Sequence, residues 1–402
     1  MLRIFLLALL ALSSGLRAQA VIEASGELPA DTRDKFGDTV GGIGSGMVYD
    51  AKNDTFITLA DRGPGDGAID FRPRFVVLKI PQNGDKLEPK VVESVLFRDE
   101  LGREMTGLIP NDLAADFPHM TDGRTCMDPE AIAIAPDGTL YVSEEYGPCL
   151  YQFQRDGKMI RRINLPEEFR PRTANWALDF SDKAPLTYGR AVNQGGEGMC
   201  LLPDGKSAAI IFQSGLIQDG SDASPFTHLI IVELATGALK ASYLYPFADR
   251  VPNTGAVLKL KHLSVNDLAY LDDHRFLVLE RDGGGRTGAL KHKPALLKSV
   301  WIADTSKATN LAESKAAANV PVAKTLLFNL PEIVAEPDQL TAKWESIAPL
   351  PSTTTGELEL MMAADNDFVT PVLHENGQEI PFPRAEESLP SQFFKIKVTL
   401  PK

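Results

Sequence analysis

Five times along the chain, a short apolar segment opens on a polar or acidic residue, turns, and returns as a second apolar segment. The clearest copy runs from Glu130 to Glu144 and turns at Pro136-Asp137-Gly138. A second copy, from Asn266 to Glu280, has the same spacing of fourteen residues and places Asp273 where the first has Asp137. Short apolar runs on either side of Pro, Asp and Gly predict β-hairpins. We therefore expect a chain built from repeated antiparallel strands.

The other copies extend this pattern over most of the chain. A third opens at Glu197, and looser copies open at Ser45 and Glu345. Further strand-like segments follow the first three hairpins, at residues 74–80, 150–153 and 229–233. Four antiparallel strands in each repeat are typical of a propeller blade. The sequence thus predicts an all-β protein, a β-propeller of four-stranded antiparallel blades.

The number of blades does not follow directly from the number of repeats. Successive openings lie 67 to 85 residues apart, more than the roughly 40 to 50 residues of compact blades. Insertions or a hidden blade must fill the excess, and residues 98–127 and 166–192 are the candidates. We predict six blades, with five repeats visible. The strand-like segment 393–398 is expected to share a blade with residues near 21–28 and so close the ring.

The first twenty residues have the pattern of a secretory signal. Arg3 precedes an apolar stretch at residues 4–12, and Ala18-Gln19-Ala20 fits a small-residue cleavage site. We predict a signal peptide over 1–20, a single mature domain over 21–402, and a periplasmic or secreted location. No later segment approaches the roughly 20 apolar residues of a membrane-spanning helix, so the mature chain is predicted to have no transmembrane segment.

Charge and cysteines constrain the partners and the compartment. The formal net charge is −13 and no Lys/Arg-rich run is present, which excludes nucleic acid as an expected partner and permits cation binding. If Asp137-Gly138 forms a two-residue turn, Cys126 lies opposite Cys149, and we predict a disulfide between them. Cys200 is predicted to be a buried free thiol.

The opening residues predict a metal site. Inner strands of a propeller begin near its central channel, so Glu130, Glu197, Asn266 and Glu345 are expected to converge there. Asp61 and Asp365, at the far ends of the looser copies, are added as metal ligands. Carboxylate and amide oxygens favour Ca²⁺. Glu145 or Glu280 is a candidate general base, and Arg62 and Arg281 are candidates to clamp a phosphate or carboxylate.

A structural interpretation of the same residues stays open. Acids at strand ends often accept backbone N–H bonds in turns, and an Arg beside an acid is frequently a surface ion pair. The turn residues Asp137, Asp204 and Asp273 are assigned to structure on this ground. The chain also lacks a Gly-x-Ser-x-Gly elbow and a His-Glu-x-x-His motif, which disfavours serine hydrolases and zinc proteases.

Taken in order, the motifs resemble the phytase-like family known as "esterase-like activity of phytase", a group of secreted propellers. The resemblance covers about residues 35 to 370 and is carried by the segments 41–46, 61–64, 128–132, 144–148, 195–198, 266–267, 280–282 and 344–346. It implies a phosphoester or ester hydrolase with acids in its site, acting on a small-molecule substrate. Three hypotheses follow: a calcium-dependent phosphoesterase or phosphodiesterase, a metal-dependent esterase or lactonase, and a non-catalytic propeller that binds a ligand or partner.

Overall fold

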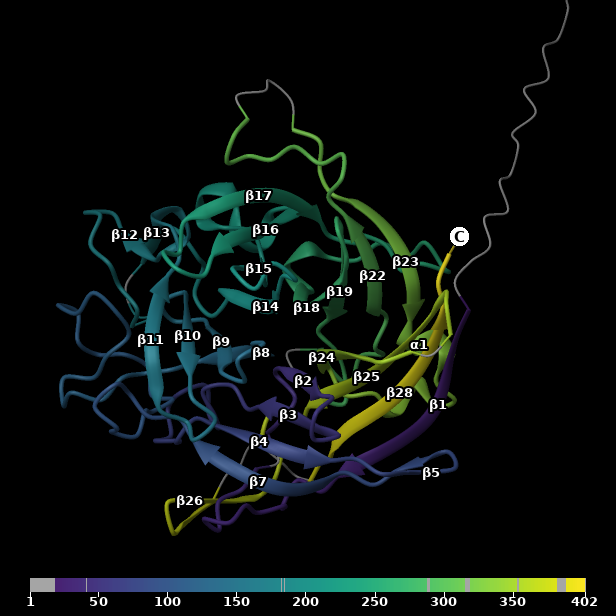
Figure 1. Cartoon of the computed structure of the whole chain (residues 1–402), viewed down its shortest axis with the longest axis horizontal. Coiled ribbons are helices and arrows are strands. Elements are labelled where there is room, and N and C mark those ends of the chain that lie inside the picture. The colour runs from purple at the N-terminus through teal and green to yellow at the C-terminus, as the bar shows by residue number, and fades with distance from the viewer. Residues whose placement is uncertain are drawn as a thin grey trace, which may run out of the picture.

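Five antiparallel sheets stand around a central axis in the computed structural model (Figure 1). The structure describes residues 19–401 except 41, 182, 184, 288–289, 315–318, 353 and 382–387. Residues 1–18 of the predicted signal peptide lie outside the described residues, while Gln19 and Ala20 already belong to the first strand.

Each of the first four blades has four strands, which follow one another outward from the axis. Blade 1 contains β2 (Met47–Asp50), β3 (Thr55–Leu59), β4 (Arg74–Lys79) and β7 (Lys90–Leu96). Blade 2 contains β8 (Pro129–Ile134), β9 (Leu140–Glu144), β10 (Cys149–Phe153) and β11 (Met159–Asn164). Blade 3 contains β14 (Gly196–Leu201), β15 (Ser207–Phe212), β16 (Phe226–Glu233) and β17 (Leu239–Pro246). Blade 4 contains β18 (Leu263–Asp272), β19 (Arg275–Asp282), β22 (Lys298–Asp304) and β23 (Ala323–Asn329).

The fifth blade joins the two ends of the described chain. It contains β24 (Lys343–Leu350), β25 (Glu357–Asp365), β28 (Ser391–Thr399) and, outermost in the blade, β1 (Gln19–Leu28). β1 pairs antiparallel with β28 from Gln19↔Thr399 to Leu28↔Ser391. The short strands β6 (Lys86–Leu87) and β5 (Gln82–Asn83) continue this sheet. The predicted closure of the ring by an N-terminal strand is confirmed.

The all-β propeller is confirmed, but the prediction of six blades is wrong. The excess residues between repeats form insertions and not a hidden blade. Residues 98–127 contain no strand, and the described residues of 166–192, which exclude 182 and 184, contain only η1 (Glu167–Phe169), β12 (Arg172–Thr173) and β13 (Leu186–Tyr188). The remaining short elements are η2 (Ile217–Asp219), η3 (Ser221–Ala223), η4 (Leu260–His262), β20 (Gly284–Gly285), β21 (Leu290–Lys291), α1 (Leu330–Ile333), η5 (Pro337–Gln339), β26 (Val372–Glu375) and β27 (Gln378–Pro381). In the part of the chain that the structure describes, no helix is long and apolar enough to cross a membrane.

The hairpin turns are stabilised by their own side chains. Asp137 Oδ1 accepts hydrogen bonds from the Thr139 backbone N–H at 2.9 Å and the Thr139 hydroxyl at 2.7 Å. Gly138 has φ +88°, a conformation that glycine adopts without a steric penalty. In blade 3, Asp204 accepts from the N–H groups of Lys206 and Ser207 in the same way. These two aspartates therefore serve the turns.

The turn in blade 2 also shows why the predicted disulfide is wrong. Ala135 and Thr139 close the turn, so Ile134 pairs with Leu140 and the assumed two-residue turn does not form. The chain then turns again after Glu144, which places Cys149 on β10, opposite Glu144. Cys126 lies before β8 and pairs with Thr106. Cys126, Cys149 and Cys200 are all free and buried.

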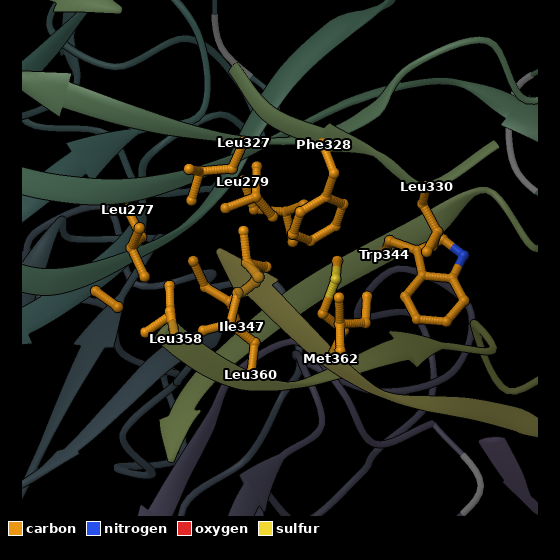
Figure 2. Close-up of a cluster of buried hydrophobic side chains, with 14 of the residues drawn as sticks. Leu277, Leu279, Leu327, Phe328, Leu330, Trp344, Ile347, Leu358, Leu360 and Met362 are labelled. Carbon is orange, nitrogen blue, oxygen red and sulfur yellow. The ribbon is translucent and has the colours of Figure 1, made fainter. Parts of the chain in front are cut away.

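Neighbouring blades pack through apolar side chains (Figure 2). Between blades 4 and 5, Leu277 and Leu279 of β19 and Leu327 of β23 contact a group from β24 and β25 that includes Ile347 and Leu360. Trp344 is fully buried and stacks on Phe394 of β28 with ring centroids 4.9 Å apart. Apolar packing of this kind fixes the ends of the inner strands relative to one another.

Candidate functional site

A β-bulge interrupts each of the five inner strands at the residue that opens the repeat. The ladder skips a residue at Glu197, Asn266 and Glu345, and two residues at Glu130-Ala131. Before β2, Gly44 and Gly46 both bond to Leu59, which leaves Ser45 as the extra residue. A bulge removes a residue from the alternation of the strand and re-aims its side chain. The same irregularity in every blade therefore turns the opening residues toward one end of the channel.

Three of the five opening residues, Glu130, Glu197 and Glu345, line a small polar cavity. Its volume is about 60 Å³, several times the roughly 10–15 Å³ that a cavity needs to hold one water molecule. All the residues that line it are polar or charged, and they come from every blade: Asp61, Arg62, Asp66, Asp128, Glu130, Glu145, Asn193, Glu197, Gln213, Arg281, Lys343 and Glu345. Seven of the twelve are acids and three are cations. Acidic side chains thus outnumber cationic ones around the cavity.

Each of the three cations is already paired with acids. Arg62 Nη1 lies 3.4 Å from Asp128 Oδ2, and Arg281 Nη2 lies 2.8 Å from Glu345 Oε1. Lys343 Nζ lies among three carboxylates and is 3.1 Å from the nearest, Asp367 Oδ1. The cations therefore do not balance the remaining acids of the cavity.

Three buried glutamates, Glu130, Glu145 and Glu197, form no salt bridge with any cation in the described part of the chain. Glu145 Oε1 accepts from the Gly195 N–H at 2.7 Å. Glu197 Oε1 accepts from Gln213 Nε2 at 2.9 Å and Asn266 Nδ2 at 3.0 Å, while the buried Glu197 Oε2 has no hydrogen-bond partner. Orphaned buried carboxylate oxygens are costly. A cation between them would remove that cost.

Burial and mutual repulsion oppose ionisation of these acids. Desolvation raises the pKa of Glu145 to about 8, with a further contribution from the charge of Asp128. Desolvation likewise raises the pKa of Glu130 and of Glu197 well above the ordinary value, and Glu197 and Glu145, respectively, add repulsion. Acids that repel one another at close range share either protons or a cation.

The geometry fits a cation with oxygen ligands. Asp128, Glu130 and Glu145 each offer a carboxylate oxygen, and the three atoms lie within 4.8 Å of one another. Oxygens bound to one Ca²⁺ at 2.3–2.6 Å can be at most about 5 Å apart. The set Asp128, Glu130, Glu145 and Glu197, here called the central carboxylate cluster, thus contains a group of suitable size for such an ion.

Four of the six predicted metal ligands line the cavity, and the other two lie behind or beside it. Glu130, Glu197, Glu345 and Asp61 line the cavity. Asn266 lies behind them: its Nδ2 donates to Glu197, and its Oδ1 accepts from the Ser264 hydroxyl at 2.9 Å. Its amide is thus used in holding Glu197. Asp365 lies beside the cavity, with its Oδ2 3.5 Å from Lys343 Nζ.

Of the predicted catalytic residues, Glu145, Arg62 and Arg281 line the cavity and Glu280 does not. Glu280 accepts from Tyr245 Oη at 2.6 Å and from the Ala248 N–H, and it pairs with Lys324. Glu280 points away from the cavity because of its position along the second strand of the blade. Glu280 is the counterpart of Glu144 at the end of the second strand, whereas the following residue, Glu145 or Arg281, reaches the cavity.

Sequence reasoning did not assign Asp128, Lys343, Gln213, Asp66 or Asn193 to the site. Asp128 and Lys343 lie two residues before the opening residues Glu130 and Glu345, so a comparison of the repeats at that offset would have pointed to them. Asp66 and Asn193 are exposed residues at the rim with left-handed backbone, at φ +55° and +53°. Nothing in the repeat pattern marks these two residues.

Glycines allow the acid-bearing strands to approach. A Cβ on Gly46 would lie 2.6 Å from the Glu130 carbonyl oxygen, and one on Gly198 would lie 2.5 Å from the Leu268 backbone nitrogen. Distances below 3.0 Å to backbone atoms cannot be relieved by a side-chain rotation. The Gly-rich segments at 42–46 and 195–198 therefore bring neighbouring inner strands close together around the cavity.

Two glycines of β14 give a matched test of this packing. Gly198→Ala is expected to lower the free energy of unfolding by about 1–3 kcal/mol, because β14 and β18 must separate. Gly196→Ala is the control, since its Cβ would meet only a side-chain methyl of Ile210 at 3.3 Å, and alanine in a strand is favoured over glycine by about 0.5–1 kcal/mol. Urea unfolding of both variants measures the difference. Equal midpoints would show that the close approach is unimportant.

Comparison with known proteins finds one similar sequence and solved structures of low similarity. An "Uncharacterized secreted protein" of Arthroderma benhamiae is 27% identical over 453 aligned positions, which cover 86% of this chain and 86% of the relative. Two solved structures match at low similarity. The Malassezia sympodialis allergen Mala s 1 has 12% identity and a TM-score of 0.39, with coverage of 91% of this chain and 81% of the other. The PQQ-bound aldose sugar dehydrogenase of Streptomyces coelicolor has 11% identity and a TM-score of 0.34, with coverage of 95% and 98%. Likeness at this level says nothing about what this chain binds.

A match to a family model covers most of the chain and identifies its family. The model of the family "Phytase-like: Esterase-like activity of phytase" matches residues 38–368, a range that contains the inner strands of all five blades and every residue lining the polar cavity. The chain therefore belongs to the phytase-like family.

Proposed function

We propose that the chain is an exported hydrolase of small phosphoesters that depends on a divalent cation, Ca²⁺ in the first place. The cation would be held by the central carboxylate cluster. The observation that carries the proposal is that the three buried glutamates of this cluster form no salt bridge in the described part of the chain, and that Glu197 Oε2 has no hydrogen-bond partner there. A bound Ca²⁺ would supply positive charge that polarises a substrate oxygen or a water molecule.

The chain's own residues would divide the remaining work. Glu145 is held by the Gly195 N–H through Oε1, so that Oε2 can accept a proton from an attacking water. Gln213 and Asn266 fix Glu197 through its Oε1. Arg62 and Arg281 lie at the cavity with guanidinium groups suited to phosphate oxygens. The cavity is too small for a whole substrate, so only the reacting group would enter it.

Two observations favour a phosphoester over a neutral ester or lactone. Among the described residues, three cationic side chains and no apolar side chain line the cavity. A carboxylester with an apolar acyl or alcohol part would find no apolar surface beside the reacting group. Export is supported by the secretory pattern of residues 1–20 and by the relative named as a secreted protein. A periplasmic location remains a prediction.

The test combines binding and turnover on the purified mature chain. Calorimetry with Ca²⁺ is expected to show binding that Glu130→Gln and Glu197→Gln abolish. Hydrolysis of an aryl phosphodiester or phosphomonoester is expected to disappear on chelation and to exceed hydrolysis of a carboxylester. Glu145→Gln should lower kcat by about 10²–10⁴-fold, the usual contribution of a general base. The control is Glu93→Gln, on an exposed position of β7.

The outcomes separate the three hypotheses. Turnover of carboxylesters with no turnover of phosphoesters would replace the proposal by a cation-dependent esterase. Cation binding without turnover of any substrate would indicate a non-catalytic propeller with a structural ion. Phosphoester turnover that persists after chelation would contradict the role of the cation, because the carboxylate cluster would then act without it.

A further inference from the structure

Lys343 Nζ lies among three carboxylates contributed by two separate segments of the chain. It is 3.5 Å from Asp61 Oδ2, 3.5 Å from Asp365 Oδ2 and 3.1 Å from Asp367 Oδ1. Asp61 follows the second strand of blade 1, and the other two acids lie at the end of β25 and just after it. Lys343 itself is the first residue of the inner strand β24. This group, here called the Lys343 cluster, thus links blades 1 and 5.

The three acids have the geometry of a cation site. One carboxylate oxygen of each lies within 4.8 Å of the others, the same limit that the central carboxylate cluster meets. Asp365 is fully buried, and its Oδ1 accepts from the Asp367 N–H at 2.7 Å, whereas its Oδ2 has no hydrogen-bond partner among the described residues and lies 3.5 Å from Lys343 Nζ. The Lys343 ammonium thus lies among carboxylate oxygens that are spaced closely enough to bind one Ca²⁺.

The position of Lys343 connects the two clusters. Lys343 and Asp61 line the same cavity as Glu130, Glu145 and Glu197. Two cationic centres would therefore face one cavity, one exchangeable and one covalently attached. In many phosphoester hydrolases two metal ions act together, because each stabilises negative charge on a different oxygen of the reacting group. An ammonium can supply such a charge but not the ligand geometry of a metal ion.

We propose that Lys343 is a built-in replacement for a second divalent cation, so that the cavity binds one exchangeable ion beside a permanent ammonium. That the Lys343 ammonium would contact anionic oxygens of the substrate rests on the proposed function. The occupation of a cation site by Lys343 does not, because it follows from the three carboxylates alone. Removal of the side chain should therefore open a second site for Ca²⁺.

Calorimetry with Ca²⁺ tests this on the mature chain and its variants. The unsubstituted chain is expected to bind about one equivalent and Lys343→Ser about two, because three acidic side chains with added water suffice for Ca²⁺. In the double variant Lys343→Ser/Glu197→Gln, about one equivalent should remain, bound by the aspartates. Lys343→Ser should also unfold at a lower temperature than the unsubstituted chain in chelator and regain stability with Ca²⁺.

A second lysine provides a matched control. Lys395 also bridges carboxylates, with Nζ 3.1 Å from Glu23 Oε2 and 3.0 Å from Glu359 Oε2, but it lies on β28, the third strand of blade 5, and does not line the cavity. Lys395→Ser is expected to add no equivalent of Ca²⁺. If Lys343→Ser does not fold, Lys343→Gln replaces it, since the amide can still donate to one aspartate, and the same second equivalent is expected.

The outcomes distinguish this inference from the proposed function. An unchanged stoichiometry in the folded Lys343 variant would overturn the inference, and so would two equivalents already bound by the unsubstituted chain. No binding by the unsubstituted chain, with one equivalent bound by Lys343→Ser, would contradict the proposed cation at the central carboxylate cluster and support the inference.

Discussion

A chain that begins at Pro29 is expected not to form a stable monomer, whereas a chain that begins at Val21 folds. The difference is the greater part of β1, which is the outermost strand of blade 5. β1 buries Ala24 and Leu28, packs Ile22 against the blade 4–5 cluster, and pairs with β28 along its length. Each large apolar side chain contributes about 1.5–3 kcal/mol on burial, and the total stability of a domain is only about 5–15 kcal/mol.

The loss also exposes a strand edge. Without β1, the N–H and C=O groups of β28 that pair with it would face solvent, and exposed edges associate with other strands. Size-exclusion chromatography of the shorter chain should therefore show oligomers or aggregates. A peptide of residues 19–28 added in excess should restore the monomer, because it replaces the missing pairing in trans. A shorter chain that remains monomeric, with an unfolding temperature within about 1 °C of the longer one, a shift of about 1 kcal/mol or less, would show that β1 is dispensable.

The second large effect is expected for Arg74→Met. Arg74 is 1% exposed at the start of β4. Its Nη1 donates to Asp34 Oδ2 at 2.9 Å and to Asp38 Oδ2 at 2.8 Å, and its Nη2 donates to Glu375 Oε2 at 2.7 Å. Removal of one partner from a buried ion pair costs about 3–5 kcal/mol, because the other charge stays buried without compensation. Because Arg72 still pairs with Asp38 and Glu375, the free energy of unfolding is expected to fall by an amount at the lower end of this range, about 3 kcal/mol.

A control and a pH series identify the cause. Lys397→Met removes a partly exposed ion pair with Glu357, for which less than about 1 kcal/mol is expected. Burial already raises the pKa of Glu375 above its ordinary value, and loss of Arg74 should raise it further. The folded variant then binds protons that the unfolded chain releases, so its stability deficit should shrink as the pH falls from 8 to 5. A deficit that is independent of pH would indicate lost packing instead of uncompensated charge.

The repeat pattern determined the fold class because the hairpins of each blade are specified by residues close together in the sequence. Hairpin turns are specified by neighbouring residues such as Asp137 and Gly138, and the strands beside them by short apolar runs, so both can be seen in the sequence. The closure of the ring was also predictable, since segments 21–28 and 393–398 are strand-like and lie at the two ends. The blade number was not predictable, because an insertion without strands and a weak blade have similar length and composition.

The candidate site was likewise predictable from the sequence only in part. The sequence by itself determined which acids open the repeats, and the symmetry of a propeller requires that equivalent positions meet near its axis. Only the tertiary structure decided which side chains face the cavity, because a one-residue change of register reverses the direction of a strand side chain. The bulges aim Glu130, Glu197 and Glu345 inward, while Glu280, one residue before Arg281, ends in a buried contact with Tyr245. The ion pairs of Lys343 with Asp61 and Asp367 join residues far apart in the chain, and such contacts are fixed by packing between blades rather than by local sequence.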